Sequence, residues 1–197
     1  MRRRGFTILE LLMVIVVISI LMTIVVAVAK NAIVMARGQR STAACIALQA
    51  AIATYQATDP EGKWPGALQN ASQSGQTRVL SNSEAQNVFR IVVQKSTGES
   101  GQPLVLVDPH LLYVAPSGAV EGKSSGRQYD DARRGDARHR PLPVAQMEFG
   151  RQGPRGKFYP FYIVYHAETD SVTLHGCCQK CMSVNGCTEM EKYCECH

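Results

Sequence analysis

Hydrophobic residues dominate the N-terminal stretch of the chain with almost no polar interruption. From Leu11 to Ala29 no side chain carries a formal charge, and Ser19 and Thr23 contribute the only hydroxyl groups. A helix from Phe6 to Ala29 would be about 36 Å long, enough to cross the ~30 Å hydrocarbon core of a bilayer. The pattern predicts a membrane-spanning helix.

A helical repeat of apolar residues continues beyond this stretch. Residues 30–57 contain no proline, and apolar side chains recur at helical spacing at Cys45, Leu48, Ile52 and Tyr55. We expect one helix from Phe6 to about Thr58, with the second half packing this stripe on a small head. Pro60 should end the helix, because proline lacks the N–H that the next helical hydrogen bond needs.

The rest of the chain reads as a mixture of one helix and several short strands. An amphipathic helix is expected at 83–95, with Ser83 as a candidate N-cap. A polar loop is expected at 123–140. The expected strands lie at 104–107, 111–115, 144–149, 158–166 and 171–174, the last two joined as a hairpin through Glu168, Thr169 and Asp170. The fold class is therefore α+β: a long helical spine on a small antiparallel head, arranged as a meander, with a Cys-rich tail.

Glu10 does not fit a plain membrane anchor. A carboxylate close to hydrocarbon costs on the order of a few kcal/mol unless it is protonated or partnered. A simple signal anchor that happens to contain a glutamate is one interpretation. A cleaved secretory signal fits less well, because the apolar run is longer than usual and no convincing small-residue cleavage site follows it.

The residues around Glu10 supply a second interpretation. The segment Arg2 to Leu12, RRRGFTILELL, resembles the N-terminus of type IV pilins and type II secretion pseudopilins. The resemblance implies cleavage between Gly5 and Phe6 by a prepilin peptidase, and N-methylation of Phe6. It also implies that Glu10 pairs with the N-terminal ammonium of a neighbouring subunit, an attraction that a low-dielectric setting strengthens.

This resemblance suggests a domain organisation and a location. Residues 1–5 would be a leader, 6–58 the transmembrane and spine helix, 59–175 an extracytoplasmic head and 176–197 the tail. Trp64 and Pro65 resemble the aromatic-proline turn that often follows the spine in pseudopilins. The implied location is the inner (cytoplasmic) membrane, single-pass, with the N-terminus cytoplasmic. The implied partners are a prepilin peptidase, other pilin or pseudopilin subunits, an inner-membrane assembly platform and membrane lipid.

Charge adds little to this picture. The formal net charge of +5 includes three leader arginines, and basic residues flank the apolar stretch equally on both sides, so the charge count does not decide the orientation. The short five-residue N-terminal segment and the resemblance place the N-terminus in the cytoplasm. A basic cluster, Arg133, Arg134, Arg138 and Arg140, could contact acidic partners, lipid headgroups or DNA. Its interleaved aspartates and lack of aromatic residues favour a solvated loop, so no nucleic acid is expected. A DNA-uptake pilin-like protein is a lesser alternative.

The C-terminal segment concentrates the cysteines. Six of the seven lie within residues 177–196: Cys177, Cys178, Cys181, Cys187, Cys194 and Cys196. Three disulfides in an oxidising compartment are one interpretation. A thiolate zinc site is the other, using Cys178, Cys181, Cys194, Cys196 and His197. Export of the tail favours disulfides, with Cys45 left as a free thiol on the spine.

These observations favour a structural protein over an enzyme. The five histidines show no nucleophile-base spacing, and the chain contains no GxSxG elbow, so we assign no catalytic residue and no cofactor. The expected function is a pilin-like subunit of a type II secretion pseudopilus or a type IV pilus, assembled through helix packing. The alternative is a membrane-tethered extracytoplasmic module that binds metal or thiols through its tail.

Overall fold

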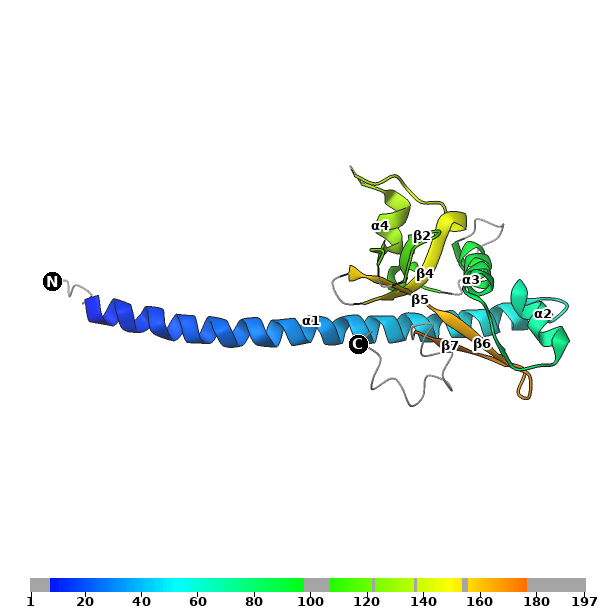
Figure 1. Cartoon of the computed structure of the whole chain (residues 1–197), viewed down its shortest axis with the longest axis horizontal. Coiled ribbons are helices and arrows are strands. Elements are labelled where there is room, and N and C mark those ends of the chain that lie inside the picture. The colour runs from blue at the N-terminus through cyan, green and yellow to red at the C-terminus, as the bar shows by residue number, and fades with distance from the viewer. Residues whose placement is uncertain (1–7, 98–106, 122, 137, 154–155, 177–197) are drawn as a thin grey trace. The chain divides into compact units, whose positions relative to one another are not determined.

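The computed structural model describes residues 8–97, 107–121, 123–136, 138–153 and 156–176 (Figure 1). The chain divides into two compact units, one up to Arg37 and one from Gly38 onward. Helix α1, Ile8–Thr58, supplies the first unit and continues into the second. We describe each unit separately, and refer to the second one as the head unit.

Helix α1 ends where the sequence predicts. Its last residue is Thr58, and Asp59 N–H still donates to the Tyr55 carbonyl at 3.0 Å. The Asp59 side chain then accepts the N–H of Glu61 at 2.9 Å, forming a turn around Pro60. The stop is therefore local, because proline removes a donor and the aspartate satisfies the backbone that follows.

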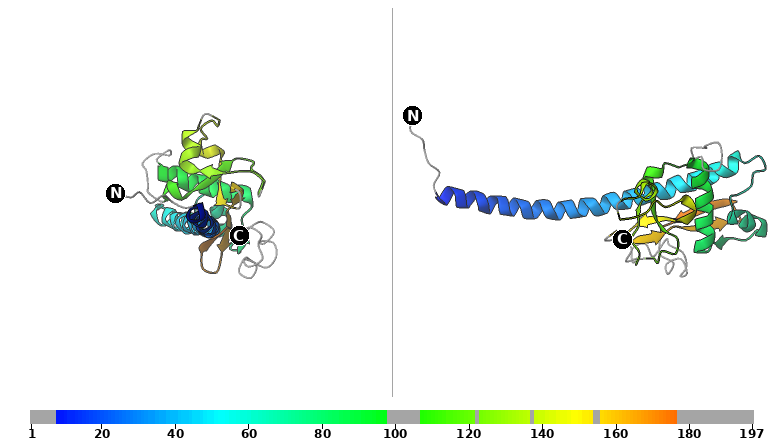
Figure 2. Two further views of the ribbon diagram at one scale, coloured as in Figure 1. Left: turned by 90° about the vertical axis from the view of Figure 1, so that its left-hand side faces the viewer. Right: turned by 90° about the horizontal axis from the view of Figure 1, so that it is seen from above.

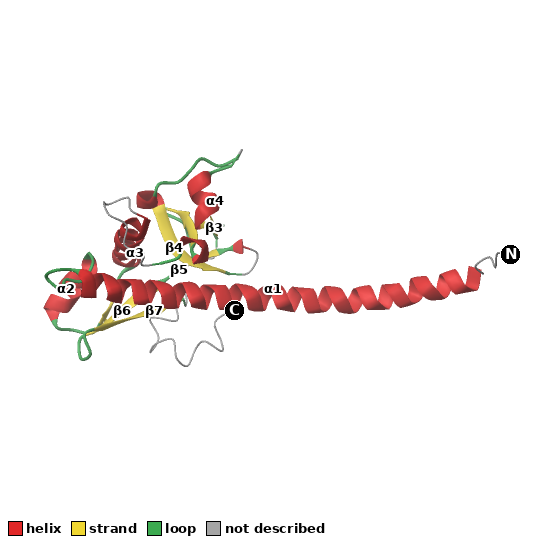
Figure 3. Ribbon diagram, turned by 180° about the vertical axis from the view of Figure 1, so that it is seen from behind, coloured by secondary structure: helices red, strands yellow, loops and turns green. Residues whose placement is uncertain are grey.

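The head unit contains short helices and strands in an α+β arrangement (Figures 1, 2 and 3). The predicted fold class is confirmed. After α1 the elements are α2 (Ala67–Ser74), β1 (Arg78–Val79), α3 (Asn82–Thr97), η1 (Pro109–Leu111), β2 (Tyr113–Pro116), β3 (Arg127–Gln128), α4 (Tyr129–Arg134), η2 (Val144–Gln146), β4 (Met147–Gln152), β5 (Phe158–Pro160), β6 (Tyr162–His166) and β7 (Ser171–His175).

The strands form two antiparallel sheets, where the sequence had predicted one meander. One sheet has the order β1-β6-β7 and the other β3-β2-β4-β5. The division falls inside the run that was expected to be one strand, 158–166. Residues 158–160 pair with β4, whereas Tyr162–His166 pairs with β7 and β1. Phe161 lies between them, and its N–H donates to the Phe149 carbonyl at 3.2 Å. The predicted β6-β7 hairpin is present.

The second half of α1 packs on the core of the head unit. Ala44, Leu48, Ala51 and Ile52 are at most 1% exposed and belong to one cluster with residues of α3 and both sheets. The predicted stripe is therefore largely right. Leu48 and Ile52 are fully buried, while Cys45 and Tyr55 are partly buried at its border.

Helix α3 begins at Asn82, one residue before the predicted range 83–95. Ser81, which precedes it, is the N-cap in place of the predicted Ser83. Glu84 Oε2 accepts the Ser81 N–H at 2.9 Å, and Ser81 Oγ accepts the Glu84 N–H at 3.4 Å. This is a capping box. The hydrogen bonds from the Ser81 backbone and hydroxyl hold the pKa of Glu84 below its ordinary value.

One expected loop and two expected strands differ from the structure. The segment 123–140, predicted to be a polar loop, contains β3 and α4, and Tyr129 and Ala132 of α4 are buried. Two buried side chains three residues apart anchor this short helix against the head. The expected strands at 111–115 and 144–149 each begin as a 3-10 turn, η1 or η2, and become strands only at Tyr113 and Met147. Residues 104–106 lie outside the described part.

Gln86 connects α3 to β4 through buried hydrogen bonds. It is 1% exposed. Its Oε1 accepts the Phe149 N–H at 2.6 Å, and its Nε2 donates to the Phe149 carbonyl at 3.0 Å. A strand residue whose N–H points at a helix needs such a partner, because a buried, unsatisfied amide is costly.

We expect Gln86→Leu to lower the free energy of unfolding by about 1 to 3 kcal/mol, because it keeps the volume but leaves the Phe149 N–H without an acceptor. Urea denaturation of the detergent-solubilised chain, followed by the fluorescence of Trp64, the single tryptophan, measures this. Gln94→Leu on the same helix, at a half-buried position, is the matched control and should cost less. An equal cost for both would contradict the proposed role of Gln86.

Candidate functional site

The N-terminal part of α1 is the candidate site, because it carries an acidic residue on an otherwise apolar exposed surface. Every residue from Ile8 to Val26 is exposed. Glu10 lies in the first turn of α1 and is also exposed. Gly5 and Phe6, the predicted cleavage and methylation residues, lie outside the described part of the chain.

The polar groups within this apolar stretch are satisfied inside the helix. Ser19 Oγ donates to the Ile15 carbonyl at 2.8 Å, and Thr23 Oγ1 donates to the Ser19 carbonyl at 2.9 Å. A hydroxyl that is bonded to the preceding turn presents little polarity to a lipid or to another helix. The exposed surface is thus apolar in its chemistry as well as in its composition, apart from Glu10.

This surface suits lipid or another apolar helix and does not suit water. Within the described residues one stretch, Ile8–Val26, is long and apolar enough to cross a membrane. Its 19 residues correspond to about 28 Å of helix. In a membrane, a carboxylate such as that of Glu10 costs free energy unless it is protonated or paired.

Comparison with known proteins explains the combination of N-terminal arginines, an acidic residue and an apolar helix. Residues 1–26 match the family described as the prokaryotic N-terminal methylation motif. The N-terminus is a prepilin segment of the type IV pilin and pseudopilin kind. The match covers the whole of the predicted processing site, and it supports a pilin or pseudopilin type of protein. No curated protein and no solved structure shows a significant match to the chain.

The motif gives the candidate site its chemistry. Proteins that carry this prepilin segment are structural subunits. A motif of this type implies that a peptidase processes the segment. It also implies assembly with other pilins. The motif together with one N-terminal apolar helix fits a membrane-anchored pilin. The roles of Gly5, Phe6 and Glu10 as individual residues stay predictions.

The head unit presents the predicted basic cluster as part of α4 and of the polypeptide after it. Arg133, Arg134, Arg138 and Arg140 are all exposed. Asp136 lies among them and accepts the Arg138 N–H at 2.7 Å and the His139 ring nitrogen at 2.9 Å. These hydrogen bonds, that from Arg138 first, hold the pKa of Asp136 below its ordinary value. Acidic groups thus lie within the cluster, as the sequence indicates. Whether the cluster contacts an acidic partner, lipid headgroups or DNA stays untested, and no nucleic acid is expected.

Cys45 lies on the head-unit part of α1, half-buried. Its thiol donates a hydrogen bond to the Leu174 carbonyl, with Sγ 3.4 Å from the oxygen. It is a free cysteine, and burial raises the pKa of its thiol to about 11. A thiol that stays protonated at neutral pH is a poor nucleophile, so this position is unreactive compared with an exposed cysteine.

The tail cysteines and the alternative zinc ligands lie outside the described residues, so both interpretations of the tail stay open. Among the described residues, no group of three or more His, Cys, Asp or Glu side chains is arranged to hold a metal ion.

We expect three disulfides in the tail of the exported protein, because an oxidising compartment favours pairing of closely spaced cysteines. Titration of the denatured, unreduced protein should then find one reactive thiol, that of Cys45. Metal analysis of the same sample should find no zinc. Seven reactive thiols with one equivalent of zinc would instead support the tetrahedral thiolate site.

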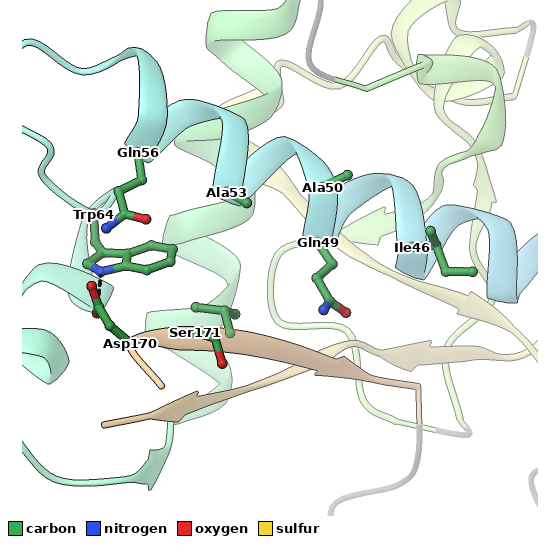
Figure 4. A pocket seen from close by; sticks show the side chains of 9 residues that line it. Ile46, Gln49, Ala50, Ala53, Gln56, Trp64, Asp170 and Ser171 are labelled. Carbon is green, nitrogen blue, oxygen red and sulfur yellow. Dashed lines mark hydrogen bonds between the residues drawn. The ribbon is translucent and has the colours of Figure 1, made fainter. Parts of the chain in front are cut away.

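One set of hydrogen bonds in the head unit, between Trp64, Tyr165 and Asp170, is not predictable from the sequence pattern. The Trp64 indole N–H donates to Asp170 Oδ1 at 3.0 Å (Figure 4), and the Tyr165 hydroxyl donates to the same oxygen at 2.7 Å. Asp170 has a positive φ of 42°, a conformation that aspartate tolerates better than most residues. The only local signal was the turn chemistry at Asp170, which does not reveal a partner 106 residues away.

Proposed function

We propose that this chain is a structural subunit of a type II secretion pseudopilus or a type IV pilus. A prepilin peptidase removes residues 1–5, Phe6 becomes the methylated N-terminus, and the subunits assemble by packing their apolar helices side by side. The observation that carries the proposal is the prepilin motif at residues 1–26 directly on an exposed apolar helix.

Physical chemistry supports packing of this helix as the assembly step. Its apolar side chains from Ile8 to Val26 have no cover within the described chain, and lipid alone gives little preference for one rotation of the helix over another. A charge pair between Glu10 and the N-terminal ammonium of an adjacent subunit would fix the register. Within the membrane, attraction between the two opposite charges would offset the cost of removing both of them from water.

The proposal includes a location. The chain would cross the inner membrane once, with residues 1–5 in the cytoplasm and the head unit outside it. The inner-membrane assembly platform would then meet the subunit in the bilayer. Within the two filament types, the Trp64-Pro65 turn after the spine favours the secretion pseudopilus, because it resembles the turn found in pseudopilins.

Intact mass and N-terminal sequencing of the membrane-extracted protein test the proposal. The chain should be produced with and without a prepilin peptidase. With the peptidase, we expect a chain that begins at a methylated Phe6, and without it an uncut chain. An uncut, unmethylated N-terminus in a host with a working secretion system would contradict the proposed function and leave a plain membrane anchor.

A further inference from the structure

Three arginines of the basic cluster carry charges that the aspartate between them does not neutralise. Arg134, Arg138 and Arg140 are exposed, and within the described part of the chain no ion pair or hydrogen bond engages their guanidinium groups. The carboxylate of Asp136 instead accepts the backbone N–H of Arg138 at 2.7 Å and the ring nitrogen of His139 at 2.9 Å. The acid therefore serves the backbone and a histidine, and the arginine charges stay open to a partner.

The polypeptide that carries these arginines is anchored to the head unit. The Asp136 N–H donates to the His139 carbonyl at 2.9 Å, and the His139 N–H donates to the Asp136 carbonyl at 3.2 Å. Beyond this turn, the Leu142 N–H donates to the Ala132 carbonyl at 2.8 Å. Ala132 is buried in α4, and Leu142 packs against the same core. Core contacts thus hold the chain on both sides of the turn.

Arg40 of α1 lies beside this surface. Its guanidinium donates to the His110 carbonyl of η1, and the His110 ring pairs with Asp130 of α4. A second aspartate of this region is thus also engaged by a histidine. The helix itself adds no acid near Arg40, because residues 11–58 contain neither Asp nor Glu.

The surface is basic even when every nearby acid is counted. Asp131 is the remaining aspartate of α4 and is exposed. The surface, which we call the arginine surface, therefore carries more positive than negative side chains: Arg40, Arg133, Arg134, Arg138 and Arg140 against Asp130, Asp131 and Asp136.

Chain connectivity keeps the arginine surface close to a membrane. Ile8–Val26 is the described stretch that is long and apolar enough to span a bilayer, and Arg40 follows 14 residues after Val26. A chain of that length reaches at most about 50 Å, whatever the arrangement of the two units. A surface tethered within this reach meets lipid headgroups at a high effective concentration, and an anionic bilayer attracts arginines near its surface.

The basic residues after the apolar stretch also fit this partner. Lys and Arg usually concentrate on the cytoplasmic side of a membrane span. This chain has as many of them after the stretch, Lys30, Arg37 and Arg40, as before it. Lipid phosphates line both faces of a bilayer, so arginines gain a partner on either side. The planar guanidinium suits phosphate because it offers two parallel N–H donors.

We propose that the arginine surface binds the phosphate groups of anionic phospholipids on the side of the membrane where the head unit lies. Each guanidinium contacts a phosphodiester through paired N–H groups, and together they hold the head unit against the bilayer until the subunit joins its partners. The inference rests on the proposed membrane anchoring. It depends neither on the processing site nor on the type of filament.

Tryptic cleavage of the full-length chain in vesicles tests this surface. Trypsin cuts after Arg134 and Arg138, and also after Lys63, which is exposed beyond the end of α1 and serves as the internal reference. The vesicles contain phosphatidylcholine alone or with phosphatidylglycerol. With the anionic lipid, we expect cleavage at the two arginines to slow on the order of tenfold relative to Lys63. High salt should remove this protection, because it screens the attraction.

A charge-matched pair of variants tests the role of the arginines. Arg40→Gln with Arg140→Gln keeps both cleavage sites and should weaken the protection. Lys95→Gln with Lys123→Gln removes two other positive charges of the head unit and should leave the protection unchanged. Equal relative cleavage of the unsubstituted chain in both kinds of vesicle would overturn the proposal and leave an acidic protein as the partner. A chain that fails to float with the vesicles would instead contradict the membrane anchoring itself.

Discussion

Gly5→Leu should leave the chain uncut in cells that contain a prepilin peptidase. The resemblance implies that the peptidase requires a small residue before Phe6, and a leucine side chain is much larger than the single hydrogen of glycine. The unsubstituted protein should lose its first five residues and gain a methyl group, whereas the variant should keep its full mass. Intact mass spectrometry of the membrane-extracted chains measures both quantities.

The control for this experiment is Gly5→Ala, which keeps a small residue at the cleavage position. We expect this variant to be processed. Processing of Gly5→Leu to the same extent as the unsubstituted protein would show that the peptidase does not recognise this residue. Failure of all three chains to be cut would contradict the proposed function itself.

Glu10→Ala should abolish assembly while leaving membrane insertion intact or improved. Removal of a carboxylate from an apolar helix takes away a cost on the order of a few kcal/mol in the membrane, so insertion should not suffer. The N-terminal ammonium of the adjacent subunit would at the same time lose its proposed partner. Crosslinked ladders of filament subunits should therefore disappear from cells that produce the variant, although the chain is still found in the membrane fraction.

Ser19→Ala is the matched control, because it removes another polar side chain from the same exposed surface. The Ser19 hydroxyl is bonded to the Ile15 carbonyl within its own helix, so we expect normal ladders. Ladders from Glu10→Ala that equal those of the unsubstituted protein would show that the carboxylate has no role in assembly. Loss of ladders in both variants would point to general disturbance of the helix surface.

Local patterns were enough to predict the parts of the fold that depend on nearby residues. The end of α1 at Thr58 followed from Asp59 and Pro60, which act on the backbone directly beside them. The β6-β7 hairpin followed from a turn of three polar residues between two apolar runs. The sequence pattern places the N-cap of α3 at Ser83 instead of Ser81, because both serines look like caps until the hydrogen bonds of Glu84 are seen.

The parts that depend on distant partners could not be predicted in this way. Residues 158–166 look like one strand, yet β4 pairs with the first part and β7 with the last. Helix α4 looks like a charged loop, because only Tyr129 and Ala132 face the core. Gln86 looks like an ordinary polar residue on a helix, and its role is apparent only beside Phe149.

The sequence by itself determined that this chain carries a prepilin segment on an apolar helix followed by an α+β head. The prepilin segment and the apolar helix rest on neighbouring residues, which are a basic N-terminal stretch, Gly5, Phe6, Glu10 and an unbroken apolar run. The class of the head rests on the periodicity of its short apolar runs. Only the tertiary structure decided which strands share a sheet, how Asp170 joins Trp64 to the hairpin, and that Arg40 lies beside η1 and α4. Each of these depends on backbone and side-chain partners that folding brings together from distant positions, for which periodicity along the chain contains no signal.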